Sequence, residues 1–241
     1  MEIKNNLKNV LSNYNLQLND NILNNLSKFN CLMLDYNKKH NLTSITDEFN
    51  VIYKHYLDSL LGYNSIKANY KQEQYKIIDI GAGAGFPSVP LCIYDENLNI
   101  TALDSVKKKT NFIEIAKNEL KLNNLSIINA RIEEIAHKEG FRESFDIVIS
   151  RAVASLSTLL EYSAPLLKVG GKIIAYKGQN YLDELETCKK ALKLLSCELD
   201  TIEEFNIKEI DAKRYILIFS KKDKTANKYP RGQNKPRLSP L

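Results

Sequence analysis

Three glycines at alternate positions after a carboxylate carry the clearest chemical signal in the chain. The carboxylate is Asp79, the glycines are Gly81, Gly83 and Gly85, and the segment reads DIGAGAG. Glycine permits positive φ and lets a ligand approach the main chain closely. A dinucleotide-binding turn would read GxGxxG, but Phe86 stands where its third glycine would be, and the GK[ST] of a Walker loop is absent. The turn therefore predicts a ligand site that is not a phosphate cradle.

The DxGxGxG spacing is typical of proteins that bind S-adenosylmethionine and transfer its methyl group. The methionine end of this cofactor is a zwitterion, so the Asp79 carboxylate could attract its ammonium group. Asp104 follows the turn by about 20 residues, where an acid can accept hydrogen bonds from both ribose hydroxyls. Ser105, next to Asp104, is a further candidate for the cofactor site. Asp104 or Ser105 could also act as a helix N-cap, and the two roles are compatible. We predict a cofactor site for S-adenosylmethionine and hence a methyltransferase.

Two later loops would face the same cofactor. Ile132 and Glu133 follow the third predicted strand, where Glu133 could contact the edge of the adenine and Ile132 its face. Arg151 follows the fourth strand, beside the transferred methyl group. That loop, residues 150–156, has no [DN]PP[FY] motif to hold an exocyclic amine and no cysteine for attack on a pyrimidine. A purine ring nitrogen such as guanine N7 needs neither device, so catalysis would consist of positioning and electrostatics.

Short apolar runs alternate with helical patterns from residue 75 onward and would position these loops. Such alternation predicts βα units and a largely parallel sheet covered on both faces. We predict an α/β fold, the Rossmann-like doubly wound sheet of class I S-adenosylmethionine-dependent methyltransferases. The predicted strands are 76–80, 99–103, 125–129, 146–150, 171–176 and 214–220, with helices at 106–120, 156–167 and 181–195.

The N-terminal part of the chain reads as a helical extension. Apolar residues recur at helical spacing in 22–34 and 52–61, with Asp20 and Asp47 as candidate caps and a polar turn at 37–44 between them. Pro87 fits the first turn of the helix after the glycines, and the Gly170-Gly171 pair predicts the end of a helix. The predicted organisation is a helical extension (1–70), a cofactor-binding α/β domain (71–222) and a basic tail (223–241).

Positive charge is concentrated at the C-terminal end. The net charge is +5, and residues 221–241 hold seven basic residues and one acidic residue. The other 220 residues hold 27 basic and 28 acidic residues and are close to neutral. A localised basic tail indicates a polyanionic partner, with nucleic acid first. A solvated, disordered terminus would have the same composition.

Cysteine spacing and hydropathy limit the class of protein. The four cysteines form no CxxC pair and are not clustered with the three histidines, so we expect no metal site. No apolar run approaches the roughly 20 residues of a membrane helix, and the first residues lack the apolar centre of a signal peptide. We expect a cytoplasmic protein with reduced thiols and no membrane attachment, acting as a monomer.

Motifs along most of the chain resemble those of the bacterial 16S ribosomal RNA guanine-N7 methyltransferases, also called the glucose-inhibited division protein B family. They begin at about Leu32 and comprise NLTS (41–44), HYLDS (55–59), residues 79–90, LDS (103–105), RIEE (131–134), SRA (150–152), YKG (176–178) and the tail 228–241. Two departures are visible. Phe86 stands where some members have Leu, and residues 232–235 lack the Gly-Thr that usually precedes the proline at 236.

The resemblance implies S-adenosylmethionine as cofactor and a guanine of the small-subunit RNA as acceptor, so the partner would be 16S ribosomal RNA or the small ribosomal subunit. It implies that Asp104 holds the ribose and that further cofactor contacts come from Gly81, Phe86, Ile132, Glu133 and Arg151. It places around the acceptor pocket Asn41, His55, Asp58, Lys177 and Arg231. Arg151 and Lys177 would border the transfer site as candidate catalytic residues.

Plainer roles stay open for several of these residues. His55 fits a core or capping histidine, Asn41 a turn residue and Lys177 a strand terminus. Two other functions also stay open: a methyltransferase for a small molecule or protein, in which the tail would be dispensable, and a non-catalytic RNA-binding protein. The complete glycine turn argues against the latter, and its spacing disfavours a nicotinamide-dependent oxidoreductase.

Overall fold

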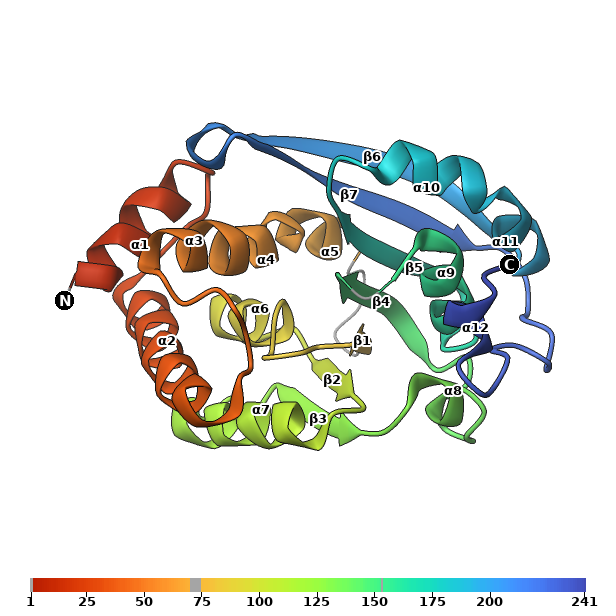
Figure 1. Cartoon of the computed structure of the whole chain (residues 1–241), viewed down its shortest axis with the longest axis horizontal. Coiled ribbons are helices and arrows are strands. Elements are labelled where there is room, and N and C mark those ends of the chain that lie inside the picture. Colours follow the sequence, from red (N-terminus) through yellow and green to blue (C-terminus); the bar gives the residue numbers. More distant parts are fainter. Residues whose placement is uncertain (1, 70–74, 153) are drawn as a thin grey trace.

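A computed structural model of the chain describes residues 2–69, 75–152 and 154–241. In these residues a seven-stranded sheet has the order β3-β2-β1-β4-β5-β7-β6 (Figure 1). β7 is antiparallel to both of its neighbours, and the other pairs are parallel. The strands are β1 (Ile77–Ile80), β2 (Ile100–Asp104), β3 (Leu125–Asn129), β4 (Phe145–Arg151), β5 (Leu167–Lys177), β6 (Cys197–Ile207) and β7 (Ala212–Lys221). The predicted doubly wound α/β fold is confirmed.

The strand order puts the predicted site residues at one edge of the sheet. The order reverses between β1 and β4, and ligands of doubly wound sheets bind beyond the carboxyl ends of the strands at such a switch point. Asp79, Asp104, Arg151 and Lys177 all lie at or near the ends of parallel strands. β7 runs the other way, so its first residues also lie at this edge, with Tyr215 opposite Lys177.

Helices cover both faces of the sheet, because successive strand residues point to opposite sides. In β1, Ile77 enters one hydrophobic core, whereas Ile78 and Ile80 enter the other. The first face carries α6 (Ser88–Tyr94) and α7 (Lys107–Leu120). The second carries α8 (Ile132–Ile135), α9 (Leu156–Ser163), α10 (Tyr181–Thr187) and α11 (Lys189–Leu194).

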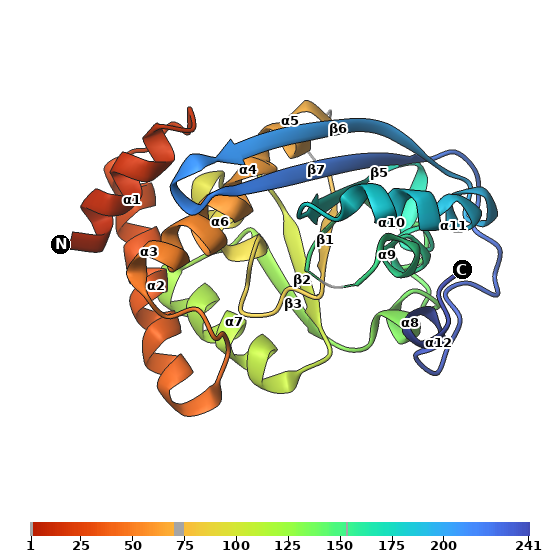
Figure 2. The ribbon, with the colours of Figure 1, turned by 45° about the horizontal axis from the view of Figure 1, so that its top comes forward.

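The N-terminal helices extend the first core. They are α1 (Glu2–Ser12), α2 (Asp20–His40), α3 (Glu48–Val51), the π-helical turn η1 (Ile52–Leu57), α4 (Asp58–Leu61) and α5 (Tyr63–Asn69). Figure 2 shows the long β6–β7 hairpin reaching toward α1. At its tip, in the short 3-10 helix η2 (Lys208–Ile210), Glu209 accepts a hydrogen bond of 2.9 Å from the Tyr14 hydroxyl. The predicted boundary between residues 70 and 71 lies outside the described residues.

Helix ends in this region differ in detail from the prediction. Asn19, not Asp20, is the N-cap of α2, because its side chain accepts the Ile22 N–H at 2.8 Å. Asp47 is confirmed as the cap of α3. α2 continues to His40 and ends at Asn41, whose φ of 47° is left-handed, so the turn begins later than predicted.

Two predictions in the second half are wrong, and one strand was not predicted. α9 ends at Ser163, and Gly170 and Gly171 lie inside β5, where the register with β4 shifts. Glycine is needed there because a Cβ on Gly171 would lie 2.9 Å from the Asp146 carbonyl oxygen. The predicted helix 181–195 is two helices that meet at Cys188. β6 was missed, because its mostly exposed, acidic sequence lacks the apolar run of a buried strand.

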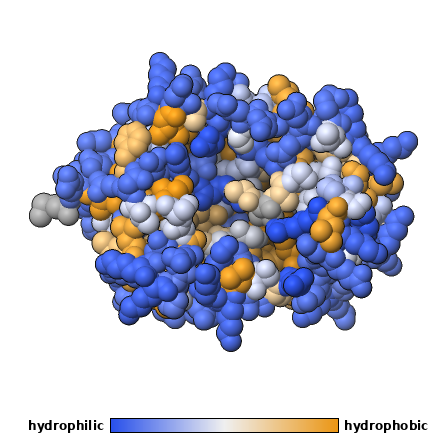
Figure 3. All heavy atoms as spheres, viewed as in Figure 1, coloured by the Kyte–Doolittle hydropathy of each residue, from blue (hydrophilic) through white to orange (hydrophobic). Residues whose placement is uncertain are grey.

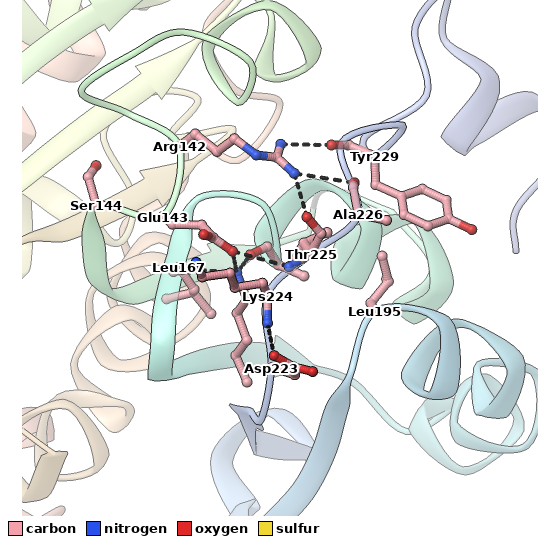
Figure 4. A network of polar contacts seen from close by, with 12 residues as sticks. Arg142, Glu143, Ser144, Leu167, Leu195, Asp223, Lys224, Thr225, Ala226 and Tyr229 are labelled. Atoms are coloured by element: carbon pink, nitrogen blue, oxygen red, sulfur yellow. Dashed lines mark hydrogen bonds and ion pairs between the residues drawn. The ribbon is translucent and has the colours of Figure 1, made fainter.

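The C-terminal segment is anchored to the body of the protein (Figure 4). Arg142 donates hydrogen bonds to the carbonyl oxygens of Thr225, Ala226 and Tyr229 at 2.7, 3.2 and 2.9 Å. Glu143 accepts from the Thr225 N–H at 3.1 Å and from the buried Lys221 ammonium at 2.7 Å. The segment ends in the short helix α12 (Lys235–Leu238). These bonds contradict a freely solvated tail.

Candidate functional site

Asp79 is the last residue but one of β1 and is wholly buried. Its Oδ2 accepts hydrogen bonds from the hydroxyl and the N–H of Ser88. Its Oδ1 has no hydrogen-bond partner in the described chain. Burial raises the pKa of this carboxyl to about 7, although the Ser88 hydrogen bonds oppose the rise. A buried polar atom without a partner is unfavourable, so Oδ1 is suited to receive a donor from a ligand.

The glycine turn beside Asp79 presents bare backbone. Gly81 and Ala82 donate their N–H groups to the Leu103 carbonyl oxygen at 2.8 and 3.1 Å, which ties the turn to β2. Gly85 has a φ of 87°, and an added Cβ would lie 2.6 Å from Val89. Gly83 has a φ of 58°, and an added Cβ would have only the Gly81 carbonyl oxygen within 4 Å. The turn therefore leaves room for a ligand against the main chain.

Asp104 links this turn to the next helix. Its Oδ2 accepts the Gly83 N–H at 2.9 Å and its Oδ1 accepts the Val106 N–H at 2.8 Å. α7 begins at Lys107 with Val106 as N-cap, so neither Asp104 nor the exposed Ser105 occupies the N-cap position. Each carboxylate oxygen can accept a further hydrogen bond, so the acid remains able to bind hydroxyl groups.

The loop after β3 lies beyond the end of β2, on the same side of the turn as Asp104. Ile132 and Glu133 begin α8, and Ile132 packs against the core of the second face. The Glu133 carboxylate accepts a hydrogen bond of 3.2 Å from Tyr162 of α9. Burial, followed by the neighbouring Glu133, raises the pKa of Tyr162 to about 12. The Glu133 side chain is therefore held by a neutral hydroxyl donor.

Arg151 joins the end of β4 to the N-terminal helices. Its Nη1 donates to the Asp58 carboxylate at 2.8 Å and to the Lys54 carbonyl oxygen at 2.7 Å. Its Nη2 lies 3.4 Å from Nδ1 of His55. The guanidinium carbon lies 5.4 Å from the centre of the Phe86 ring, within the range of a cation–π contact. The π-helical turn η1 supplies both the Lys54 carbonyl and His55.

His55 is a neutral side chain in this cluster. Its ring stacks on Phe86 with centroids 4.6 Å apart, and its Nε2 lies 3.1 Å from the Thr43 hydroxyl. Burial, and then the charge of Arg151, lowers the pKa of His55 to about 4. Phe86 is itself buried against Phe29 and Tyr56, so it connects the glycine turn to the helical extension.

Two candidate functional residues, Arg214 and Glu184, were not predicted from the sequence. Arg214 of β7 donates from Nε to Asp58 Oδ1 at 3.1 Å, a contact that spans 156 residues. Glu184 of α10 accepts from the Lys177 ammonium at 2.7 Å and from the Leu156 N–H at 2.8 Å. No local pattern marks either residue, because both depend on the antiparallel β7 and on the packing of α10.

A pocket of about 600 Å³ opens among these groups. It lies beyond the ends of β4 and β5, and Figure 3 shows a hollow near the centre of the face seen in Figure 1. The lining residues are Asp58, Arg151, Ala152, Ala154, Tyr176, Lys177, Gly178, Glu184 and Arg214. The Lys177 ammonium also donates to the Ala154 carbonyl oxygen at 2.7 Å.

Three predicted acceptor residues do not line this pocket. His55 is not among its lining residues, although its Nδ1 lies 3.4 Å from Nη2 of Arg151. Asn41 caps α2 and is exposed. Arg231 forms a bidentate ion pair with the wholly buried Glu161 of α9, with N···O distances of 2.8 and 2.7 Å. Of the residues described, no group of three or more His, Cys, Asp or Glu could hold a metal ion, and no helix is long and apolar enough to span a membrane.

Comparisons with known sequences find relatives along most or all of the chain. The family described as rRNA small subunit methyltransferase G matches residues 22–215. Ribosomal RNA small subunit methyltransferase G of Alkaliphilus oremlandii is 38% identical over 241 residues, the whole of both chains. The protein of the same name from Thermoanaerobacter sp. (strain X514) is 42% identical over 214 residues, covering 89% of this chain and 88% of that protein.

Solved structures share the fold at low sequence identity. TYW2 of M. jannaschii, in complex with AdoMet, has a TM-score of 0.51 and 19% identity over 68% of this chain and 76% of its own. A putative sarcosine dimethylglycine methyltransferase from Galdieria sulphuraria has a TM-score of 0.54 and 14% identity, covering 77% of this chain and 92% of its own. Likeness at this level establishes a common architecture.

Proposed function

The chain belongs to the rRNA small subunit methyltransferase G family, and we propose that it transfers a methyl group from S-adenosylmethionine to N7 of a guanine in 16S ribosomal RNA. The observation that carries the chemistry is the buried, unpartnered Oδ1 of Asp79 beside an open glycine turn. The substrate is the RNA or the small subunit that contains it. The protein acts in the cytoplasm as a monomer.

The residues at the carboxyl edge fit the parts of the cofactor. Asp79 would hold the ammonium group, the turn at Gly81, Gly83 and Gly85 its methionine portion, and Asp104 the ribose hydroxyls. The adenine would lie by Ile132 and Glu133, and Phe86 would support the turn from behind. When bound, S-adenosylmethionine supplies an electrophilic methyl group. The roles of Asp79 and of the turn rest on the unpartnered oxygen and on the three glycines, which have no side chains.

No residue of the pocket is needed as a general base. Guanine N7 carries an in-plane lone pair and no proton at neutral pH, so the chain has to position the ring and exclude water. His55 is neutral and engaged with Thr43 and Phe86. Arg151 and Lys177 act as positioning groups, with their hydrogen bonds directed to fixed acceptors.

Ion pairing in the pocket also suits the charge that develops on the acceptor. Methylation of N7 leaves the guanine ring positively charged, and unpaired cations beside it would oppose the transfer. Arg151 is paired with Asp58 at 2.8 Å and Lys177 with Glu184 at 2.7 Å. The carboxylates therefore offset the nearest positive charges.

Methyl transfer can be tested with the purified protein and labelled S-adenosylmethionine. The acceptors are 16S ribosomal RNA and small subunits from cells that lack this protein, with 23S ribosomal RNA as the matched control. Mass mapping of nuclease fragments should locate one N7-methylguanine in 16S RNA and none in 23S RNA. Label in protein or small molecules, with none in RNA, would refute the proposal, and Asp79→Asn should abolish transfer.

A further inference from the structure

The pocket beside Lys177 keeps one unbalanced positive charge. Its cations are Arg151, Lys177 and Arg214, and its carboxylates are Asp58 and Glu184. Glu184 pairs with Lys177, but the single carboxylate of Asp58 serves two guanidinium groups, through Oδ2 to one and Oδ1 to the other. The neighbouring His55 contributes no charge at neutral pH, because its pKa is lowered to about 4. The pocket therefore keeps a net charge of +1.

Arg214, unlike Arg151, has a terminal nitrogen with unused hydrogen-bond donors among the described residues. Arg151 is only 13% exposed, and both of its terminal nitrogens face protein atoms. Arg214 is 24% exposed and uses Nε for Asp58 and Nη1 for the Lys213 carbonyl oxygen, at 3.1 Å each. Its Nη2 donates no hydrogen bond within the described parts of the chain. That nitrogen belongs to a side chain that lines the pocket.

A second, negatively charged hydrogen-bond acceptor would balance the remaining positive charge and accept from Nη2 of Arg214. A guanidinium carries several N–H groups in a planar fork that suits phosphate oxygens, and Asp58 fixes the fork by holding Nε. In RNA, the phosphates carry the negative charge, and contacts to them set the register of the nucleic acid. We propose that Arg214 binds a backbone phosphate of the acceptor RNA next to the methylated nucleotide. This inference rests on the proposed function.

Lys213 provides a matched control in the adjacent position. Successive residues of a strand point to opposite sides, and Lys213 is paired with Glu204 at 2.6 Å, 47% exposed and not part of the pocket lining. Removing its charge changes the net charge of the protein by the same amount as removing that of Arg214. If Arg214 binds a phosphate, removing its charge lowers the affinity for RNA more than removing the charge of Lys213 does. A general effect of net charge would lower the affinity equally in both variants.

The test measures binding of 16S ribosomal RNA by Arg214→Met and Lys213→Met across a salt series. Arg214→Met should lower affinity about tenfold or more and reduce the slope of log affinity against log salt by about 0.7 to 1. Lys213→Met should leave the slope close to that of the wild type, and Arg214→Lys should restore most of it. Cofactor affinity and thermal unfolding check that each variant is folded.

Two outcomes would overturn the inference. One is an unchanged salt slope in a folded Arg214→Met protein. The other is a loss confined to cofactor affinity or kcat, which would mean that Arg214 acts only by positioning Asp58. If the wild-type protein transfers no methyl group to RNA, the proposed function fails instead, so the two failures are distinguishable.

Discussion

Ser88 hydrogen-bonds one carboxylate oxygen of Asp79, Oδ2, through both its hydroxyl and its N–H, while the other oxygen lies buried without a partner. This one-sided pairing fixes the direction of the carboxyl group and leaves it poorly solvated. Burial raises the pKa of Asp79 to about 7, against the opposing effect of the Ser88 hydrogen bonds. Protonation of Asp79 and binding of a cationic ligand group at Oδ1 would then compete.

Cofactor affinity should therefore fall as the pH is lowered from 7.5 to 5.5. Binding of an ammonium group requires the ionised carboxylate, so the loss should approach about tenfold per pH unit below 7. Asp79→Asn should bind more weakly at pH 7.5 and show little of this dependence. Calorimetric titration at several pH values measures both, and a flat profile for the wild type would contradict the ammonium assignment.

The same carboxyl group should affect the stability of the cofactor-free protein. Its pKa is higher in the folded state than the ordinary 3.8, so the folded state binds the proton more tightly. This contribution is fully present below pH 4 and is lost as the pH rises through 7. Urea unfolding of the wild type and Asp79→Asn should show this loss in the wild type alone.

Asp104→Ala should weaken cofactor binding by roughly 10- to 100-fold, because hydrogen bonds to a charged acceptor would be lost. Part of the effect would come through the turn, since Asp104 also holds the Gly83 N–H. Asn111→Ala, at an exposed position of α7, is the control and should bind normally. Titration with the cofactor measures both variants. Unchanged affinity in Asp104→Ala would rule out the ribose role.

Acid should destabilise the protein through His55. Burial and Arg151 lower its pKa from 6.5 to about 4, so the stability it contributes is present above pH 6.5 and is lost as the pH falls through 4. The shift corresponds to about 3 kcal/mol. Urea unfolding at pH 7 and pH 4 should therefore show a smaller acid loss in His55→Gln than in the wild type. His40→Gln, at the exposed end of α2, should behave as the wild type does.

The residues that sequence reasoning found are those with local patterns. The glycine turn, Asp79 and Asp104 lie at the ends of short apolar runs. The predicted strand 125–129 has the same bounds as β3. Hydrophobic periodicity reports whether a segment is buried, so the buried parallel strands were recognised. The exposed, acidic β6 carries no such signal, and with it the reversed direction of β7 was also undetermined.

The partners of the charged site residues could not be found in this way. Arg214 meets Asp58 across 156 residues, and Arg231 meets Glu161 across 70. Each contact is decided by how helices and strands pack, which no spacing along the chain encodes. The prediction that the Gly170-Gly171 pair ends a helix was wrong for a related reason, since the close approach of β4 requires glycine within β5.

Arg231 should prove to be a stabilising residue. Arg231→Met would leave the wholly buried Glu161 without its bidentate partner, which is expected to lower the free energy of unfolding by about 3 to 5 kcal/mol. Replacing both residues, as Glu161→Gln with Arg231→Met, should lose less than Arg231→Met alone, because no buried charge remains. Urea unfolding at pH 7 measures the three proteins.

Lys235→Met removes another cation of the C-terminal segment and serves as the control, since Lys235 is exposed at the start of α12. It should leave stability unchanged. The acceptor-pocket role implied by the family resemblance makes the opposite prediction for Arg231→Met: a raised KM for RNA with normal unfolding. Because all three nitrogen donors that Arg231 directs at Glu161 are already engaged, we expect the loss of stability, and normal unfolding of Arg231→Met would contradict this account of the tail.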